Sequence, residues 1–346
     1  RNPPFSSGVY TWWHWMNGNI TKDGITCDLE AMKANGIAGY QLFEAGSGIP
    51  IGPVESLSDE WVDLILHTLK ESERLGLEFA MHNCPGWSSS GGPWITLDKA
   101  MQIITWSETK VTGGKQIRMP LPTPKHMFDY YIDTFCLAIP ANMEVIPKSS
   151  VLELSGQLKD GVLTWAAPAG EWLIMRFGQT AKDQKNKSAP SKSTGLDCDK
   201  FSTEALDYHL DCMFKRLMPA MEKVAKHSKI GLLIDSYETG DQDWTSDMPA
   251  YFEQKHRYAL YPFLPALANK VVESEESTKR FLFDFRRTRA DLFAERYYAH
   301  FQKRCKEKGI ITYTEPYGGN MMEELQVAQQ LDINMGEFWC GQTVLW

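Results

Sequence analysis

Residues 9–45, VYTWWHWMNGNITKDGITCDLEAMKANGIAGYQLFEA, contain the pattern that decides the fold. The β-rich run 9–15 is followed by a helical segment, 21–36, whose apolar residues fall on one face and which ends at Gly36. A second apolar, strand-like run occupies 39–45. Strand, helix and strand joined by short connections predict a parallel βαβ unit.

The same alternation continues along the chain. Residues 58–76 predict a helix with Ser58 as N-cap and Gly76 at its end, and residues 77–84 predict a third strand. After an interruption, we expect strands at 229–235, 310–314 and 333–338, and helices at 202–225, 248–258, 276–309 and 323–332. Six βα-type strands, with no G-x-G-x-x-G after the first, favour an α/β fold of the TIM-like (β/α)8 barrel type over a doubly wound sheet. Because such a barrel needs two more units, we expect this barrel to be incomplete and the chain to lack the C-terminal part of a longer protein.

The interruption is a β-rich segment. Short β-type runs separated by Pro and Gly turns extend over 102–197 and predict a small antiparallel subdomain inserted after the third strand. The segment closes with the polar stretch KDQKNKSAPSKSTG, 182–195, which predicts a mobile loop. The chain therefore divides into a first barrel part with strands one to three (1–101), the insertion, and a second barrel part with strands four to six (198–346).

The amino-acid composition excludes some classes of binding partner. The 346 residues carry a net charge of −8 with a sequence pI near 5.6, and no basic cluster stands out, so nucleic acid is not an expected partner. No apolar run approaches the roughly 18 residues of a membrane span, and the first residues do not form a signal peptide. The seven cysteines include no C-x-x-C pair and predict neither a zinc site nor a disulfide framework.

Carboxylates follow three of the later strands. Asp235 and Glu238 lie in LLIDSYETGDQDW, Glu315 lies in ITYTEPYGG and Glu337 lies in INMGEFW. In a barrel these strand ends share one face, where active sites lie. A poorly solvated carboxyl group can act as a general acid, and glycoside hydrolysis needs two carboxyl groups around the scissile bond. The alternative is that some of them are helix caps or ion pairs at the rim of the barrel.

Aromatic and polar side chains follow the first and third strands. YTWWHWMNGN places His14, Trp15 and Asn17 at the first strand end, and MHNCPGWSSSGGPW places His82, Asn83 and others beside many small donors at the third. Flat apolar surface with hydroxyl and amide groups suits a sugar, although the same residues could be purely structural. No G-x-S-x-G or protease signature surrounds the nearby serines and cysteine, so nucleophilic catalysis by them is not expected.

A metal site is left open by the residues alone. Clustered carboxylates and amides are oxygen ligands that suit calcium, whereas the scattered His and Cys residues do not form a zinc pattern.

Taken together, several motifs resemble those of a known family. WWHWMNGNITKDGITCDLEAMKANGI, MHNCPGWSSSGGPWI, AMQIITWSE, GLDCDKFS, DSYE, TEPYGG and MGEFW occur in the order in which they occur in glycoside hydrolase family 106, the α-L-rhamnosidases. The resemblance extends from about residue 8 to 340. It implies a catalytic barrel of a large, calcium-dependent, inverting enzyme of bacteria or plants, in which β-sandwich domains follow the barrel, and an extracytoplasmic (periplasmic or secreted) location.

The resemblance also implies roles for individual residues. Glu238 in DSYE would be the general acid, Glu337 in GEFW the base that activates water, and Glu315 in TEPYGG a further active-site carboxylate. The motifs also place further side chains in the sugar pocket, and with those named above the expected substrate-binding set is His14, Trp15, Asn17, His82, Asn83, Trp87, Asp235, Tyr317 and Trp339. The calcium ligands cannot be assigned to positions of this sequence.

The expected function is hydrolysis of terminal α-L-rhamnosidic bonds in plant or complex polysaccharides, with inversion. A first alternative is a retaining barrel glycosidase that acts on another sugar with Glu238 as acid/base; it is weakened because many such enzymes have Asn where Tyr237 stands here. A second alternative is a carbohydrate-binding barrel without catalytic activity.

Overall fold

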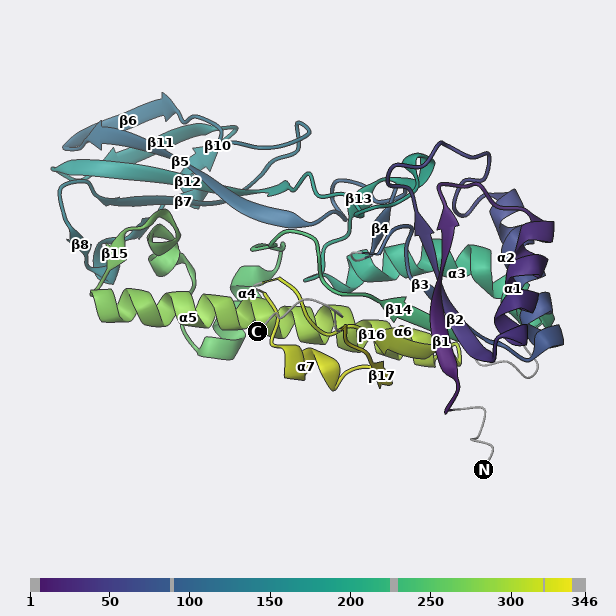
Figure 1. The fold of residues 1–346 in the computed structure, drawn as a ribbon. Helices are drawn as coiled ribbons and strands as arrows, with labels where there is room; N and C mark the ends of the chain where they lie inside the picture. Colours follow the sequence, from purple (N-terminus) through teal and green to yellow (C-terminus); the bar gives the residue numbers. More distant parts are fainter. Residues whose placement is uncertain (1–6, 88–89, 225–229, 320, 338–346) are drawn as a thin grey trace. The chain divides into compact units, whose positions relative to one another are not determined.

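The computed structural model describes residues 7–87, 90–224, 230–319 and 321–337. Contacts between residues divide the chain into two compact units (Figure 1). The parallel-sheet unit comprises residues 1–99, 184–241 and 293–346, and the antiparallel unit comprises residues 100–183 and 242–292. The division differs from the predicted segments, because residues 184–197 belong with the parallel sheet and residues 242–292 with the antiparallel strands.

The parallel-sheet unit is built on a sheet of six strands that pair in chain order. Each strand is parallel to its neighbours, and the strands are β1 (Val9–Met16), β2 (Ile37–Ala45), β3 (Glu78–His82), β14 (Ile230–Ile234), β16 (Ile311–Thr314) and β17 (Ile333–Asn334). The predicted α/β class is thereby confirmed. The sheet has two edges among the described residues, β1 and β17, so the pairing by itself does not establish a barrel, and the barrel stays a prediction.

The helices of this unit begin and end where the sequence signals lie. The Thr21 side chain accepts a hydrogen bond from Gly24 N at the start of α1, and the Ser58 side chain accepts one from Trp61 N at the start of α2, which ends at Gly76 in the left-handed conformation. The helical elements are α1 (Lys22–Ala34), α2 (Asp59–Leu75), η4 (Ser191–Ser193), α3 (Thr203–Val224), a π-helical turn η6 (Phe293–Ala299), α6 (His300–Lys306) and α7 (Glu324–Ala328). A short antiparallel pair, β4 (Gly91–Gly92) and β13 (Leu196–Asp197), completes the unit.

Alternate residues of β1 point to opposite faces of the sheet. Trp13 and Trp15 are buried on the face that α1 and α2 cover, and Trp13 Nε1 donates to Asp28 Oδ2 of α1 at 2.9 Å (Figure 1). Trp12 and His14 lie on the other face, where Trp12 is 43% exposed. Because the side-chain period of a strand is two, β1 sends one aromatic pair to the core and one to the opposite face.

The sheet curls strongly toward that opposite face. Gln41 Nε2 on β2 contacts Met335 Sδ, just after β17, at 2.9 Å. Four strand spacings separate β2 from β17 in the sheet order, which is about 19 Å in a flat sheet with strands about 4.8 Å apart. Two side chains cannot bridge that distance to make direct contact, so the sheet must bend to bring its distant strands together.

The antiparallel unit contains two principal sheets and a helical segment. One sheet is β5 (Gln102–Thr112), β12 (Glu171–Ala181), β7 (Ile132–Pro140) and β9 (Leu152–Glu153), and the other is β10 (Leu158–Lys159), β11 (Val162–Ala167) and β6 (Lys115–Pro120). Their apolar faces share a core that includes Cys136, Leu163 and Ile174. The remaining elements are β8 (Val145–Ile146), η2 (Lys148–Ser150), η3 (Ser155–Gln157), α4 (Met248–His256), η5 (Tyr261–Ala268), β15 (Val271–Val272) and α5 (Glu275–Leu292).

Residues 242–292 belong with the antiparallel strands for a physical reason. β15 pairs in parallel with β8, and Asp243 accepts a hydrogen bond from the backbone N–H of Ile104 on β5 at 2.8 Å. These long-range pairings have no local sequence signal, which is why the predicted boundary at residue 198 did not include them. No helix among the described residues is both long and apolar enough to cross a membrane.

The loop after β1 depends on a glycine that permits close backbone contact. Gly18 has φ of +76°, and a Cβ atom there would lie 2.2 Å from Val54 O. Gly36, at the end of α1, has a nearly equal φ of +78° but no atom within 4 Å of the corresponding position. Substitution of Gly36 by alanine would therefore introduce backbone strain alone, whereas substitution of Gly18 would introduce the same strain and a steric clash.

We expect Gly36→Ala to lower the free energy of unfolding by about 1 kcal/mol, because an alanine must adopt a left-handed conformation. Gly18→Ala should cost roughly 1–3 kcal/mol more, since the loop must also move away from Val54. Urea denaturation followed by circular dichroism measures both. Equal losses in the two variants would show that the backbone contact contributes nothing.

Candidate active site

A cavity of about 330 Å³ opens at the carboxyl ends of the parallel strands. Its aromatic lining comes from β1, β2 and the segment after β3, and its charged lining comes from the segments after β14 and β17 and from the stretch before β13. Aromatic surface beside convergent polar groups is typical of a small-molecule site. The lining residues are Trp12, His14, Phe43, Trp87, Lys187, Asp235, Ser236, Glu238 and Glu337.

β14 positions two of the carboxyl groups. Its five residues are all buried, and the strand ends directly before Asp235. Three residues further on, Glu238 lies at the exposed rim, where Ser236 Oγ donates to Oε1 at 3.2 Å and Lys187 Nζ lies 2.5 Å from Oε2. Lys187 and Glu238 thus form an ion pair at the rim of the cavity.

Asp235 and Glu315 form a buried pair of carboxyl groups. Glu315 follows β16, its backbone N–H donates to Ile234 O at 3.2 Å, and its Oε2 accepts from Tyr317 OH at 2.7 Å. The side chains of Asp235 and Glu315 also hydrogen bond to each other. Burial, and next the negative charge of Glu315, raise the pKa of Asp235 to about 9, and burial also raises the pKa of Glu315. Asp235 therefore holds a proton at neutral pH and donates it to Glu315.

Glu337 completes a group of four carboxyls. It lies three residues after β17 and two after Met335, whose N–H donates to Thr314 O of β16 at 2.8 Å. Its side chain is exposed and lines the cavity, and its charge is among the causes of the raised pKa of Glu315. The three expected catalytic residues therefore come from three adjacent strands, with Glu238 and Glu337 in the cavity wall and Glu315 buried behind them.

The structure brings only some of the expected sugar-binding residues to the cavity. His14, Trp87 and Asp235 line it, and burial lowers the pKa of His14, which favours the neutral ring. Tyr317 is not in the lining but bonds to Glu315. Trp339 lies outside the described residues.

Trp15 and Asn17 lie elsewhere. Trp15 is 2% exposed and packs edge-to-face against Trp13 on the helix-covered face of the sheet. Trp15 directly follows His14 on β1, and successive side chains of a strand point to opposite faces. Asn17 is buried with φ of 51°; its Nδ2 donates to Ile49 O at 2.6 Å and its Oδ1 accepts from Ser191 N at 2.9 Å. Asn17 thus holds loops together rather than facing the cavity.

His82 and Asn83 also belong to the supporting structure. His82 is buried against Phe43, its Nδ1 lies against the backbone of Cys84, and burial lowers its pKa to about 4. Asn83 is fully buried, and its Nδ2 donates to Leu233 O at 2.8 Å, which ties the end of β3 to β14. Both residues fix the cavity wall without lining it.

Four lining residues were not expected from the sequence. Trp12 and Phe43 could have been found from strand parity, because each shares a face with His14. Ser236 stands between two predicted site residues. Lys187 gave no local signal, since it lies in the polar stretch 182–195.

The stretch 182–195 is anchored rather than loose. Asn186 is buried, its Nδ2 donates to Pro85 O at 2.9 Å, and its Oδ1 accepts from Gly195 N at 2.7 Å. Trp87 N also donates to Lys187 O at 3.3 Å. These bonds hold Lys187 beside the third strand end, at the cavity.

Calcium is the metal ion that the family resemblance implies. No group of three or more His, Cys, Asp and Glu side chains among the described residues is arranged to hold a metal ion. Calcium takes six to eight oxygen ligands, typically with several carboxylates. Backbone and amide oxygens can also bind the ion, so calcium stays a prediction and no chemical step is assigned to it.

Comparison with known proteins assigns the family. A model of glycoside hydrolase family 106, described as α-L-rhamnosidase, matches residues 1–134 and 125–344. The chain belongs to this family. The family resemblance seen in the sequence is thereby confirmed, and the chain is part of a glycosidase family.

Two similar proteins are longer than this chain. A protein of Formosa agariphila named "Putative beta-glucuronidase" is 41% identical over 373 residues, which cover 99% of this chain and 32% of that protein. The solved structure of a rhamnosidase from Novosphingobium sp. PP1Y has the same fold, with a TM-score of 0.80 and 24% identity over 95% of this chain and 48% of that one. The chain spans about a third and about half of these two proteins.

The protonated Asp235 makes a prediction about stability. An unfolded aspartate loses its proton near pH 4, whereas folded Asp235 keeps it to about pH 9. Because the pKa is raised by folding, this group's contribution to stability is fully present below about pH 4 and is lost as pH rises toward 9. Asp235→Asn cannot ionise, so its melting temperature minus that of the wild type should increase between pH 4.5 and pH 9.

Scanning calorimetry at matched pH values measures this margin between the two melting temperatures. Glu55→Gln removes an exposed carboxylate outside the cavity and serves as the control, with a margin that stays nearly constant. A margin for Asp235→Asn that is constant or shrinks with pH would exclude a buried, protonated Asp235.

Proposed function

We propose that this chain carries the catalytic site of an inverting glycosidase that releases terminal α-L-rhamnose from plant or complex polysaccharides. The observation that carries the proposal is the presence of Glu238 and Glu337, from β14 and β17, in the wall of one aromatic-lined cavity. Glu238 acts as the general acid for the leaving oxygen, and Glu337 as the base that activates water. Glu315, hydrogen bonded by Asp235 and Tyr317, is the third carboxylate.

The lining of the cavity suits a neutral deoxy sugar. Rhamnose carries a methyl group in place of a hydroxymethyl group, so it presents apolar surface to rings such as those of Trp12, Phe43 and Trp87. A glucuronide, the substrate in the name of the Formosa relative, carries a carboxylate that needs a cation. Among the described residues of the lining, Lys187 is the one lysine, and it already forms an ion pair with Glu238. It is therefore not available to a substrate carboxylate, which favours the neutral sugar.

The strand order supports inversion. β14 and β17 are two places apart in the sheet, so their ends start about 9–10 Å apart before curvature shortens the distance. Inverting enzymes hold their two carboxyl groups about 6.5–9.5 Å apart to admit a water, and retaining enzymes about 5–5.5 Å. We assign the wider spacing to Glu238 and Glu337. Proton NMR of the first product, showing inverted anomeric configuration, tests this against the retaining alternative.

The curled parallel sheet also supports the proposed barrel. The contact between Gln41 and Met335 requires the curvature of a closing sheet, and the cavity lies at the strand ends where barrels place their active sites. We infer that the six strands are part of a (β/α)8 barrel.

Substitution of the two proposed catalytic residues should separate their roles. Glu238→Gln should lower kcat/KM by about 10²–10⁴-fold on an alkyl α-L-rhamnoside and much less on the dinitrophenyl rhamnoside, whose leaving group needs no proton. Glu337→Gln should lower both by similar factors, since both need an activated water. Hydrolysis rates measured side by side give the comparison.

Glu30→Gln, on the surface of α1, is the matched control and should leave both rates unchanged. Equal losses on both substrates for Glu238→Gln would move the acid role to another residue. Failure of the wild-type chain to cleave either rhamnoside, with binding intact, would favour the carbohydrate-binding alternative.

Lys187 provides a test of whether the ion pair positions Glu238. Lys187→Met removes the ammonium group that lies 2.5 Å from Glu238 Oε2. We expect kcat/KM on both rhamnosides to fall by no more than about fivefold, because an exposed ion pair contributes at most about 1 kcal/mol. Lys185→Met, in the same stretch but outside the lining, should leave both rates unchanged, and equal losses in the two variants would show that the ion pair does not position Glu238.

A further inference from the structure

A second cavity lies within the antiparallel unit and shares no residue with the candidate active site. It has a volume of about 380 Å³ and is enclosed by β5, α5 and the segments around residues 243 and 267. Its floor is apolar and aromatic, whereas its other side chains are charged. The lining residues are Ile104, Trp106, Asp243, Leu267, Lys279, Leu282, Phe285, Arg286 and Arg289.

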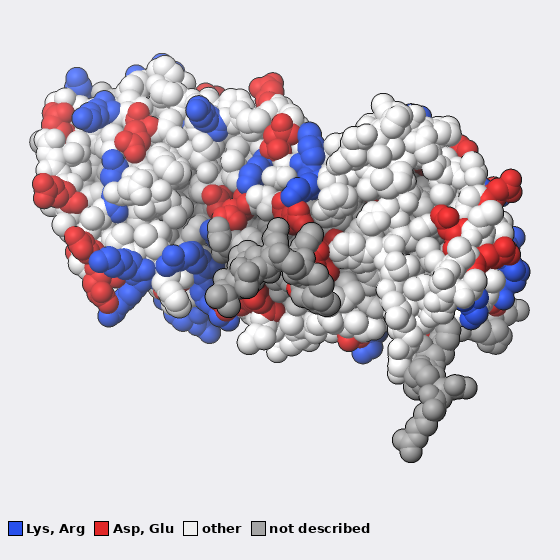
Figure 2. Space-filling model, in the orientation of Figure 1, with Lys and Arg blue, Asp and Glu red and all other residues white. Residues whose placement is uncertain are grey.

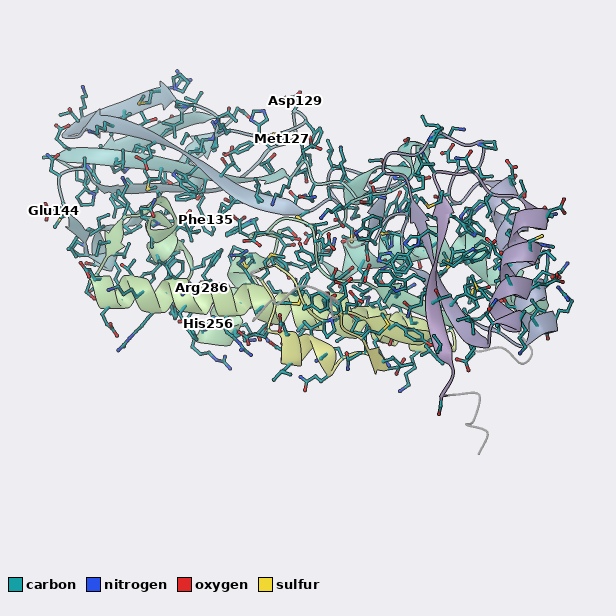
Figure 3. All side chains as sticks on the ribbon, viewed as in Figure 1. Met127, Asp129, Phe135, Glu144, His256 and Arg286 are labelled. Carbon is teal, nitrogen blue, oxygen red and sulfur yellow. The ribbon has the colours of Figure 1, made fainter. Side chains whose placement is uncertain are left out.

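Helix periodicity brings three cations to this cavity. Lys279, Arg286 and Arg289 are seven and three residues apart on α5, so they fall on one face of the helix, over about 15 Å of its length. Figure 2 shows Lys and Arg side chains gathered over the region that α5 occupies in Figure 1, and Figure 3 labels Arg286 on that helix. Asp243 is the single carboxylate in the described lining.

Several of the lining groups are fixed in place. Arg289 Nε donates to Gln242 O at 2.9 Å, and Asp243 Oδ1 accepts from Ile104 N at 2.8 Å. The Trp106 ring packs against Phe177 with the ring centroids 6.0 Å apart. The floor and one cation are therefore already ordered around the cavity.

Arg286 differs from its neighbours on the helix. Arg280 pairs with Glu276 and Arg287 with Asp291, each one turn away on α5. Within the described part of the chain, Arg286 makes no hydrogen bond or ion pair, although it lines the cavity. Lys279 Nζ lies 3.5 Å from Glu275 Oε2 and Arg289 donates to Gln242 O, so Arg286 is the cation of the lining that is available to an incoming anion.

We propose that this cavity binds an anionic saccharide, a sugar unit that carries a carboxylate or a sulfate ester. Guanidinium groups bind such oxyanions in bidentate geometry, and an aromatic ring such as that of Trp106 accepts the C–H face of a sugar. The choice of a saccharide rests on the proposed function, whereas the demand for an anion rests on the cavity alone. The cavity would hold a charged part of a polysaccharide, separately from the bond that is hydrolysed.

A compact ligand fits better than an extended polyanion. The same helix carries Glu275, Glu276, Asp284 and Asp291, so a nucleic acid or an acidic peptide laid along α5 would meet negative charge outside the cavity. A neutral sugar, in turn, gains nothing from the charge of Arg286. The charge pattern therefore favours one or two anionic sugar units.

Isothermal titration calorimetry of the full chain tests the proposal. The probes are tetragalacturonate, its fully methyl-esterified form, a sulfated carrageenan tetrasaccharide and a poly-glutamate peptide. We expect binding of one or both anionic saccharides, which tells carboxylate from sulfate, and at least tenfold weaker binding of the neutral ester. Binding should weaken as ionic strength rises.

Arg286→Met should weaken binding of the saccharide about tenfold, and Trp106→Phe, which keeps an aromatic ring, should weaken it less. Arg280→Met changes the same charge six residues away on α5, outside the lining, and should have no effect. Equal effects of Arg280→Met and Arg286→Met, equal affinity for the neutral ester, or poly-glutamate binding at least as tight as the saccharides would overturn the proposal.

The result does not depend on catalysis. Glu238→Gln should bind the anionic saccharide like the wild type, and Arg286→Met should cleave an aryl α-L-rhamnoside at the wild-type rate. Loss of cleavage with binding intact would therefore count against the proposed function alone, and loss of binding with cleavage intact against this inference alone.

Discussion

The two faces of the parallel sheet decide what every side chain near the strand ends can do. Each side chain of β1 points either to the helices or to the concave side of the sheet, because successive side chains of a strand alternate between its two faces. On the helix side, Trp13 and Trp15 build the core. On the concave side, Trp12 and His14 form the wall of a cavity, and the curl of the sheet brings segments from distant strands to the same place.

That geometry concentrates negative charge. Four carboxyl groups from three strands approach one another, and charges of like sign in a poorly hydrated place are costly. The chain meets this cost in two ways: Asp235 keeps its proton and shares it with Glu315, and Lys187 balances Glu238 at the rim. The charge of the site is thus distributed over a buried pair and an exposed pair, and salt screens the exposed pair more strongly.

The sequence alone predicted much of this arrangement, and the misses have physical causes. Strand order, helix caps at Thr21 and Ser58, and the carboxylates at the strand ends follow from local patterns and were found. The sequence did not show that Trp12, and not Trp15, faces the cavity. Adjacent aromatic residues point to opposite faces of a strand, and the run of tryptophans does not indicate which of them lie on which face. Asn83 looked like a ligand group because polar residues at strand ends usually are exposed; its bonds to another strand appear only in three dimensions. Lys187 and the segment 242–292 depend on long-range contacts, which local patterns cannot report.

Lys187 lies close to the point at which the chain passes from the antiparallel unit back to the parallel-sheet unit. It stands six residues after the last residue of β12, in the return path by which the chain leaves the antiparallel strands, and Asn186 fastens that path to the third strand end. Excising residues 100–183, or exchanging them for another insertion, would therefore keep Lys187 in the chain but change the segment that leads into it. An exchange that preserves the cation beside the carboxyl cluster must also preserve the anchoring of Asn186, three residues after Asp183.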